Sequence, residues 1–352
     1  MQILRKQRVW FLLILLSLIA FLLLCFPLGD GVRQAMTRPV WTIGIYEGDT
    51  PLDIHPSARR PVPLFNEESM KDLKIRVMAD PFLIREGGAW HLFFEVMGEK
   101  TEKGAIGHAA SQDLVHWSYG GVVLDEPFHL SYPCVFRWEN EIYMIPETSE
   151  IHSVRLYRAE AFPGRWQFVK TLIHADGISD PSIFRVNGKW WLYGGDISCR
   201  NLRLYLADDL AGPWREHPQS PILQGNPFFS RPAGRVIQWN GKILRFAQQD
   251  IPDYGKQVWA FEVPILSESQ YAEKPARNTP LLEAAGGDAW NGQGMHHVDL
   301  REWADGKWVA AVDGFREERS VEILLNRVFC KCRKSSGCFF RGNDPSEPSP
   351  RR

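Results

Sequence analysis

Three carboxylates are the residues of this chain best suited to acid–base chemistry. Asp80 and Asp180 each directly precede a proline, and Glu147 directly follows one. Hydrolysis of a glycosidic bond needs two carboxyl groups that face each other across a pocket, because one protonates the leaving oxygen while the other acts as base or nucleophile. We therefore predict Asp80 as the base, Asp180 as its partner and Glu147 as a further catalytic candidate. An aspartate before proline also caps turns through its side chain, so a structural role stays open for both aspartates.

Six further residues are predicted to bind a substrate. They are Tyr132, Arg231, His296, His297, Trp90 and Trp191. Hydroxyl, guanidinium and imidazole groups suit a hydroxyl-rich or anionic ligand, and indole rings stack on sugar rings. The alternative for Arg231 is a salt bridge to Asp80 or Asp180. Because side chains alternate along a strand, at least one of the adjacent Trp190 and Trp191 is expected in the core.

A pattern that recurs about every 50 residues must position these side chains. Each copy has a polar residue, proline or a near equivalent, an apolar run, a short turn rich in Asn and Gly, and an aromatic strand. The five copies begin at Ala79, Ser131, Ser179, Ser230 and His296. Repeats of this kind are typical of β-propellers, in which each copy is one blade and its first strand lines a central channel. The sequence therefore predicts an all-β, five-bladed β-propeller whose leading polar residues converge in one funnel.

A second pattern lies inside the first. Trp117, Trp166 and Trp214 each end a segment with a small residue, an acidic turn and an apolar anchor, where the third strand of a blade would end and the fourth begin. Residues 41–46 are predicted to close the circle by pairing with residues 321–325, because closure removes the exposed edges of an open sheet. An acidic residue follows the hairpin of each of four repeats: Glu147, Asp196, Asp250 and Asp313. This repetition also suits a structural role in which the carboxylate stabilises the turn.

The N-terminal segment predicts a membrane anchor. Arg5, Lys6 and Arg8 precede the apolar residues 9–27, a run long enough to cross most of a bilayer. The basic residues place residues 1–8 in the cytoplasm and the propeller outside it, in the Golgi lumen of a eukaryote or at the periplasm or cell surface of a bacterium. A cleaved signal peptide is the alternative. Residues 28–39 are predicted as a linker, 40–328 as the propeller and 329–352 as a disordered tail.

Charge and cysteine content argue against several classes of partner. The formal net charge is -1 and the basic residues are dispersed, so no nucleic acid is expected to bind. The cysteines Cys330, Cys332 and Cys338 lack the paired spacing of a zinc site. We predict neither a metal nor a cofactor.

Several segments resemble a known family. Phe94-Glu95-Val96-Met97, Tyr143-Met144-Ile145-Pro146-Glu147, Arg231-Pro232-Ala233-Gly234-Arg235 and residues 126–133 are similar to the N-terminal propeller domain of glucosamine inositolphosphorylceramide transferases. The resemblance runs from about Trp41 to Arg327. It implies a type II membrane anchor, a role with sphingolipid head groups in the Golgi, and a glycosyltransferase domain after the propeller. Because few residues follow Arg327, we expect any such transferase to be a separate partner.

The Asp-Pro blades with their Asp-Leu-x-x-Trp segment also resemble the five-bladed propellers of glycoside hydrolase family 43. That family has Asp, Asp and Glu at the heads of its first three blades, where this chain has Asp80, Tyr132 and Asp180. Glu147 or Glu95 would then have to supply the acid.

We expect a membrane-anchored, carbohydrate-active propeller that binds or processes a glycan or glycolipid head group. The alternative is a non-catalytic glycan-binding scaffold that recruits a separate glycosyltransferase. Carboxylates at hydrolytic separation would favour the first reading, and salt-bridged aspartates the second.

Overall fold

The computed structural model describes Ser17 and residues 37–99, 101, 103–196, 198, 200–251, 254–303 and 306–319. These residues belong to two units. Residues 40–316 form one unit, and residues 1–39 with 317–352 form the other, in which Arg38 donates a hydrogen bond to Glu318 at 2.8 Å. Apart from Ser17, the predicted anchor at residues 9–27 lies outside the described residues. Among those that are described, we find no helix with the length and apolarity that a membrane span requires.

The strands form five groups, numbered I to V. Group I contains β3 (Ile75–Glu86), β4 (Ala89–Gly98), β5 (Ala105–Ser111) and β6 (Ser118–Leu124). Group II contains β7 (Ser131–Trp138), β8 (Glu141–Glu147), β9 (Ser153–Ala161) and β10 (Arg165–His174). Group III contains β11 (Ile178–Val186), β12 (Lys189–Asp196), β13 (Leu202–Ala207) and β14 (Arg215–Glu216). Group IV contains β15 (Arg231–Pro232), β16 (Ile237–Trp239), β17 (Lys242–Gln249), β18 (Gln257–Leu266), β19 (Tyr271–Pro275) and β20 (Leu282–Glu283). Group V contains β21 (Val298–Glu302), β22 (Trp308–Arg319), β1 (Thr37–Thr50) and β2 (Asp53–Pro56).

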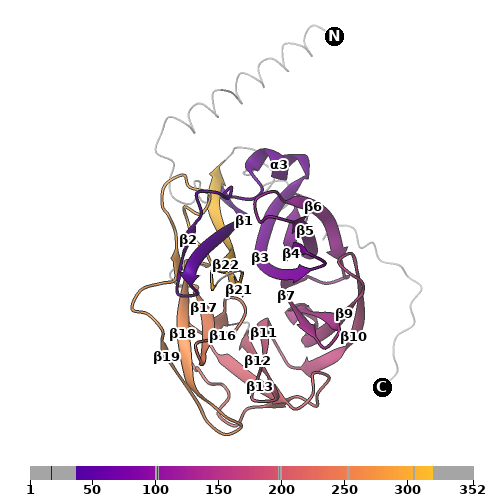
Figure 1. Cartoon of the computed structure of the whole chain (residues 1–352), viewed down its shortest axis with the longest axis vertical. Helices are drawn as coiled ribbons and strands as arrows, with labels where there is room; N and C mark the ends of the chain where they lie inside the picture. The colour runs from indigo at the N-terminus through magenta and orange to yellow at the C-terminus, as the bar shows by residue number, and fades with distance from the viewer. Residues whose placement is uncertain are drawn as a thin grey trace, which may run out of the picture. The chain divides into compact units, whose positions relative to one another are not determined.

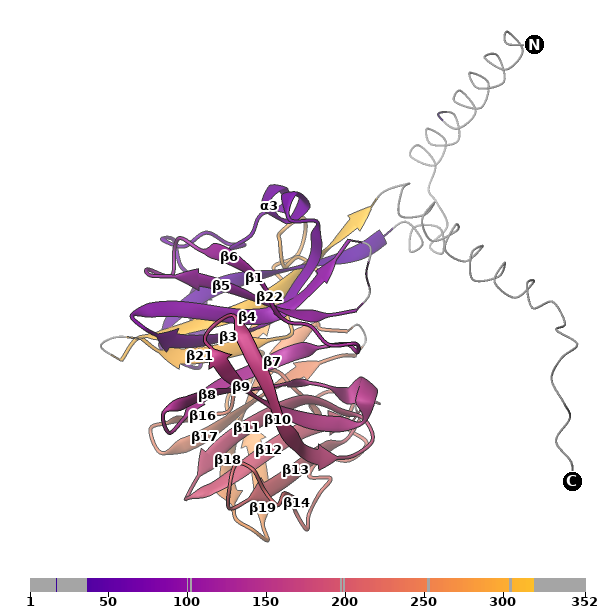
Figure 2. The same ribbon diagram turned by 90° about the vertical axis from the view of Figure 1, so that its right-hand side faces the viewer.

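The groups follow one another around a common centre, with β3, β7, β11 and β21 nearest to it (Figure 1). Within each group neighbouring strands are antiparallel, whereas β1 pairs in parallel with β3 at Trp41 and Val77 and so joins groups V and I into one eight-stranded sheet. The short helix α3 (Glu67–Asp72) lies beside group I in both views (Figures 1 and 2). A single 3-10 turn, η1 (Ser149–Ile151), follows β8. The all-β prediction is confirmed.

Closure differs in detail from the prediction. The strand β1, which contains residues 41–46, lies beside β22. The predicted partner, residues 321–325, lies outside the described residues. In the part that is described, β22 (Trp308–Arg319) is long enough to pair with β21 on one side and with β1 on the other.

The Asn-Gly turns fold as the repeat predicts. Val186 pairs with Lys189, which leaves Asn187 and Gly188 as a two-residue loop, and both residues have positive φ angles of 51° and 80°. Two consecutive left-handed residues define the hairpin turn that follows the right-handed twist of the flanking strands, and asparagine and glycine tolerate it best.

Replacing Asn187 with alanine should lower the free energy of unfolding by about 1 kcal/mol, because alanine adopts a left-handed conformation at a higher cost. Urea denaturation would measure it. Asn140→Ala is the matched control, since Asn140 also lies in an exposed hairpin turn but does not have a positive φ. Equal effects of the two substitutions would contradict this account.

The core lies between neighbouring groups and is rich in aromatic rings. The ring of Trp166 meets that of Phe93 edge-on at 5.4 Å across groups I and II, and Trp190 meets Trp138 at 5.0 Å across groups II and III. The repeated tryptophans occupy the predicted junctions. Trp117 and Trp214 directly precede β6 and β14, and Trp166 is the second residue of β10. The indole of Trp166 donates to the carbonyl oxygen of Pro163 at 3.0 Å, so it also fixes the turn.

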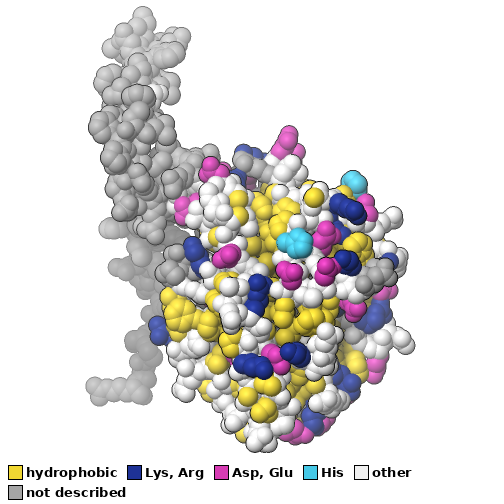
Figure 3. Space-filling model, turned by 60° about the vertical axis from the view of Figure 1, so that its left-hand side comes forward, with side chains coloured by type: hydrophobic (Ala, Val, Ile, Leu, Met, Phe, Trp, Pro, Cys, Tyr) yellow, Lys and Arg dark blue, Asp and Glu magenta, His cyan; other side chains and the backbone are white. Residues whose placement is uncertain are grey.

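Acidic and basic side chains are interspersed on the face of the molecule that Figure 3 shows, with apolar side chains between them. This mixture agrees with the near-zero net charge of the chain.

Candidate functional site

The residues that lead the first three repeats share an unusual backbone conformation. Asp80, Tyr132 and Asp180 have positive φ angles of 53°, 47° and 51°. At each of them the register between the first and second strands of the group shifts, which marks a β-bulge. A left-handed non-glycine residue costs on the order of 1–3 kcal/mol, and a following proline disfavours helical conformations further. The surrounding structure must therefore hold these three side chains in place.

Carboxylates of neighbouring groups provide part of that support. Asp313 of group V accepts a hydrogen bond from the backbone N–H of Asp80 at 2.9 Å, and Asp80 accepts one from the N–H of Tyr132 at 3.3 Å. Glu147 accepts one from the N–H of Asp180 at 2.9 Å. The carboxylates thus link one group to the next. Among the described residues the carboxylates of Asp80 and Asp180 accept hydrogen bonds from neighbouring groups.

Asp180 lies in an ion pair. Its Oδ2 is 2.5 Å from Nε of Arg231 and 2.9 Å from Nε2 of Gln248. Glu147 joins this cluster and also accepts a hydrogen bond from Oγ of Ser149 at 2.7 Å. Burial works against ionisation of Glu147, but Arg231 and these hydrogen bonds outweigh it and lower its pKa. Glu147 is therefore an anion at neutral pH.

Asp80 lies in a second cluster with His296 and Asp313. Nδ1 of His296 is 2.8 Å from Oδ2 of Asp313, and its Nε2 is 3.8 Å from Oδ1 of Asp80. Burial opposes protonation of His296, but Asp313 overcomes it and raises the pKa of His296 to about 9. Burial also raises the pKa of Asp80 to about 6, with His296 opposing that rise.

His297 has a different environment. Its ring packs against Phe82 at 4.7 Å and Tyr132 at 5.1 Å, and both ring nitrogens are buried without a hydrogen-bond partner among the described residues. Burial lowers the pKa of His297 to about 4, so the imidazole is neutral. It lies in the cluster, with Nδ1 3.6 Å from Oδ1 of Asp80.

Asp80, His296 and Asp313 place three possible metal ligands within 4.8 Å of one another. Two carboxylates and an imidazole would suit a divalent cation. However, Oδ1 of Asp313 already accepts from the backbone N–H groups of His296 and His297, and Oδ2 accepts from that of Asp80. These bonds use lone pairs that a cation would need, so the geometry favours an ion-pair network over a metal centre.

Glu95 matches Glu147 by register but not by environment. It pairs with Ala79, directly before Asp80, just as Glu147 pairs with Ser131, directly before Tyr132. Its Oε1 lies 3.4 Å from Nε2 of His129. Burial, together with the negative charge of Asp80, raises the pKa of Glu95 to about 8. At neutral pH Glu95 therefore carries a proton.

Three of the predicted substrate-binding residues either lie away from the central cluster or are buried in contacts that stabilise the fold. Trp90 is buried and pairs with Arg85 at the hairpin end of its strand, away from Glu95. Trp191 is buried in the core cluster that also contains Val236. Tyr132 is completely buried, and its hydroxyl bonds to Ser182 at 2.6 Å and to the carbonyl oxygen of Gly234 at 3.0 Å. The structure therefore gives no support to a role of these three residues in binding a ligand at the central cluster.

Sequence reasoning missed one aromatic residue beside the cluster. Tyr254 lies in the loop between β17 and β18, the residue as a whole is 46% exposed, and the guanidinium of Arg231 lies over its ring at 5.1 Å. Its ring also meets those of His296 at 5.3 Å and Trp41 at 6.1 Å. It belongs to no repeated segment, so the repeat pattern could not reveal it. Gln248 and Glu95 lie on the second strands of their groups, where Gln248 pairs with Arg231 and Glu95 with Ala79, so an alignment of the second strands could have revealed both.

Asp196 and Asp313 show that the repeated acidic residues do not share one role. Asp196 accepts hydrogen bonds from the backbone N–H of Arg200 at 3.0 Å and from Ser198 at 2.8 Å, so its carboxylate stabilises the turn that follows its strand. Asp313 instead belongs to the central network.

Comparison with known proteins supports the resemblance in the sequence. The family described as glucosamine inositolphosphorylceramide transferase 1, N-terminal, matches residues 34–315. Glucosamine inositolphosphorylceramide transferase 1 of Oryza sativa subsp. japonica is 35% identical over 315 residues, which cover 83% of this chain and 41% of the rice protein. The protein of the same name from Arabidopsis thaliana is 32% identical over 298 residues, covering 78% of this chain and 39% of the relative.

A solved structure shares the fold. The catalytic domain of the Coprinopsis cinerea GH62 α-L-arabinofuranosidase superposes with a TM-score of 0.52 at 13% identity, covering 68% of this chain and 92% of that one. The chain spans about two fifths of the length of the rice and Arabidopsis relatives. It belongs to the family of the N-terminal region of glucosamine inositolphosphorylceramide transferase 1.

Proposed function

We propose that residues 40–316 form a five-bladed β-propeller that binds a glycan or glycolipid head group at the central cluster, without hydrolysing it. The five strand groups in chain order support the propeller. Membership of a family named for a glycosyltransferase supports a carbohydrate-related function. The ligand would lie over Glu95, Asp80 and Arg231, beside the exposed ring of Tyr254.

The ion pair of Asp180 carries this proposal. A hydrolase of the expected kind needs two carboxyl groups free to exchange protons with substrate and water. The carboxylate of Asp180 is paired with Arg231 and accepts a hydrogen bond from Gln248. The carboxylate of Glu147 accepts hydrogen bonds from the backbone N–H of Asp180 and from Ser149. Salt-bridged aspartates are what the binding hypothesis predicts. Arg231, Glu95 and Tyr254 then offer a positive charge, a neutral acid and an aromatic surface, which are groups that hold sugars.

Glu95 keeps a catalytic alternative open. Its pKa of about 8 makes it a proton donor at neutral pH, and Asp80, with a pKa of about 6, is ionised there. Two carboxyl groups whose environments set their pKa values apart can share the roles of acid and base. In this second candidate function Glu95 is the general acid and Asp80 the base.

The relatives suggest the kind of ligand and the partner. Their names describe transfer involving glucosamine and inositolphosphorylceramide. We infer a glycosylated lipid head group as the ligand class, and a glycosyltransferase domain or protein as the partner. The apolar residues 9–27 would anchor the chain in a membrane with the propeller on the extracytoplasmic side.

Replacing Tyr254 with alanine should weaken glycan binding about two- to tenfold, because an exposed ring beside a polar cluster contributes about 0.5–1.5 kcal/mol through stacking. The ligand would come from a screen of neutral and amino-sugar oligosaccharides, and calorimetry would measure the affinity. Phe168→Ala is the matched control, since Phe168 is similarly exposed at 43% but lies on β10, the fourth strand of group II.

Two outcomes would reject the proposal. One is that no oligosaccharide binds the wild-type chain. The other is that the Tyr254 and Phe168 variants bind equally well. Release of a reducing sugar by the wild type, but not by Glu95→Gln, would favour the catalytic alternative.

A further inference from the structure

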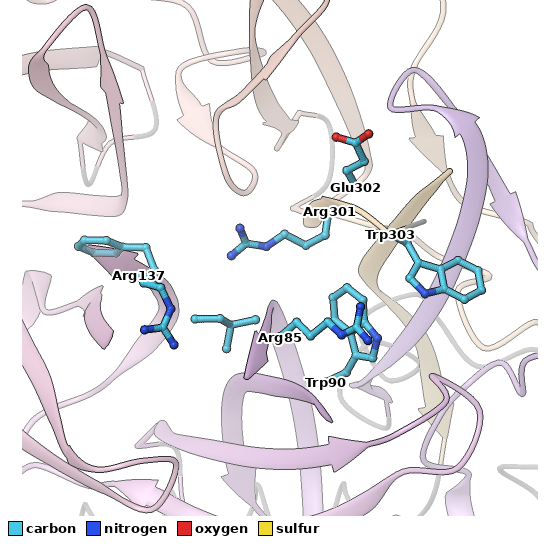
Figure 4. Close-up of a pocket in the computed structure, with 8 residues that line it drawn as sticks. Arg85, Trp90, Arg137, Arg301, Glu302 and Trp303 are labelled. Carbon is cyan, nitrogen blue, oxygen red and sulfur yellow. The ribbon is translucent and has the colours of Figure 1, made fainter. Parts of the chain in front are cut away.

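A second site lies at the other end of the innermost strands. A pocket of about 370 Å³ opens where β3, β7 and β21 end, and Arg85, Trp90, Arg137, Arg301, Glu302 and Trp303 line it (Figure 4). Asp80 and Arg85 are five residues apart on β3, so about 15 Å of strand separates this pocket from the central cluster. We call it the arginine pocket. It takes no part in the proposed glycan site.

The positive charge of the pocket exceeds its negative charge. Arg85, Arg137 and Arg301 face one acidic lining residue, Glu302, and Figure 4 shows the Glu302 carboxylate directed away from the three guanidinium groups. Arg137 is paired with Glu86, outside the lining. The guanidinium of Arg85 lies over the ring of Trp90 at 5.8 Å and makes no hydrogen bond within the described part of the chain.

Arg301 has a buried nitrogen that makes no hydrogen bond among the described residues. Its Nε donates to the carbonyl oxygen of Leu83 at 2.9 Å, but one terminal nitrogen is buried without a hydrogen-bond partner among the described residues. Asp299 is 3.8 Å away and already accepts from Arg235 at 2.8 Å. Burial and the positive charge of Arg235 lower the pKa of Arg301 to about 10. In Figure 4 its side chain extends across the pocket toward Arg137.

The arginines recur with the sequence repeat. Ile84-Arg85, Phe136-Arg137, Phe184-Arg185 and Leu300-Arg301 place an apolar residue and then an arginine at or near the end of the innermost strand of four groups. In group IV the corresponding residue is Gln238. Alternation then keeps the apolar residue in the core, where Ile84, Phe136, Phe184 and Leu300 are all buried. The repeat therefore directs the guanidinium groups to one end of the fold.

We propose that the arginine pocket binds a phosphate group, carried either by a soluble phosphate compound or by a lipid head group. Three guanidinium groups approaching from different strands can each donate to a different oxygen of a tetrahedral anion. A phosphate group also carries a charge of about -1.5 to -2 near neutral pH, which matches several guanidinium groups better than the single charge of a carboxylate. The indoles of Trp90 and Trp303 give the pocket walls that an ester group can contact.

Calorimetry with the full chain and inorganic phosphate tests the soluble source. Vesicles of phosphatidylcholine, with and without phosphatidic acid, test the lipid source, because phosphatidic acid offers a phosphate without a sugar. We expect Arg301→Gln and Arg85→Gln each to weaken binding of the active probe about tenfold, since a hydrogen bond to a charged group contributes about 1.5 kcal/mol or more. Added salt should weaken it further.

Three controls keep the result interpretable. Arg165→Gln removes an arginine that is 67% exposed and paired with Glu160 on group II, so it should bind like the wild type. Arg85→Gln should fold normally even if Arg301→Gln does not, because Arg85 only stacks on Trp90. Tyr254→Ala should leave phosphate binding unchanged, which separates this site from the glycan site.

Binding of inorganic phosphate would support the soluble source, and selective binding of vesicles with phosphatidic acid would support the lipid source. The proposal is overturned if the wild type binds neither probe, or if both pocket variants bind as tightly as the Arg165 control.

Discussion

Replacing Arg231 with glutamine should lower the free energy of unfolding by about 3–5 kcal/mol, because it leaves the buried carboxylate of Asp180 without its counterion. Nε of Arg231 lies 2.5 Å from Asp180, whose side chain is only 2% exposed. Arg231 also favours ionisation of Glu147. A single substitution therefore leaves two buried carboxylates less well compensated.

Urea denaturation near pH 7 would measure this effect. The double variant Arg231→Gln, Asp180→Asn should recover much of the loss, since it removes the uncompensated charge together with its partner. Arg165→Gln breaks an exposed ion pair and should change stability little. If Arg231→Gln were as mild as Arg165→Gln, or if the second substitution recovered nothing, the ion pair would not have the role assigned to it.

The same ion pair bears on function. An arginine that compensates Asp180 and also lies over the exposed ring of Tyr254 can remain charged beside a ligand. A pair of hydrolytic carboxylates would instead need the proton of Asp180 or Glu147 to move during each turnover. Arg231 and the hydrogen bonds of Glu147 lower the pKa of that carboxyl and oppose its protonation, whereas burial raises the pKa of Asp180 well above its ordinary value although Arg231 opposes the rise. The proposal of binding without hydrolysis therefore rests on the contacts that already engage Asp180 and Glu147.

Repetition made the centre of the fold predictable from the sequence. Asp80, Tyr132 and Asp180 have the same place in three copies, and the structure gives all three the same bulge and the same sign of φ. Their convergence with Arg231 and His296 follows from the arrangement of the groups around one centre (Figure 1). A repeated local signal therefore predicts a repeated local geometry.

The roles of single residues were less predictable. Trp90 and Trp191 are in the expected strands, but register places Trp90 beside Arg85 at the hairpin end and alternation places Trp191 in the core. Tyr132 is at the expected position, yet its hydroxyl bonds to Ser182 and Gly234 from other groups. Such contacts depend on residues about 50 and 100 positions away, which no local pattern specifies.

Glu95 and Glu147 also show that a local pattern does not specify the environment of a side chain. They have the same side chain and matching register in groups I and II. Glu147 has Arg231, Ser149 and the N–H of Asp180 as partners, which lower its pKa. Glu95 has negative neighbours and burial, which raise its pKa from an ordinary value of 4.5 to about 8.

Replacing Glu95 with glutamine should therefore stabilise the chain at high pH. Because the folded-state pKa lies above the unfolded one, the contribution of Glu95 is fully present below about pH 4.5 and is lost as the pH rises through 8. A shift of this size corresponds to roughly 4–5 kcal/mol. We expect Glu95→Gln to match the wild type at pH 4 and to exceed its free energy of unfolding by up to that amount at pH 9.

Glu147→Gln is the matched comparison and should behave in the opposite way. Its pKa is lowered on folding, so its stabilisation is present above its unfolded pKa and is lost as the pH falls through the folded value. Glu147→Gln should then be less stable than the wild type at pH 7, with a difference that shrinks in acid. Urea unfolding of the three chains between pH 4 and pH 9 would measure both profiles. Parallel profiles for the two variants would show that their environments are equivalent, and Glu95 would then lose its place as the protonated group of the site.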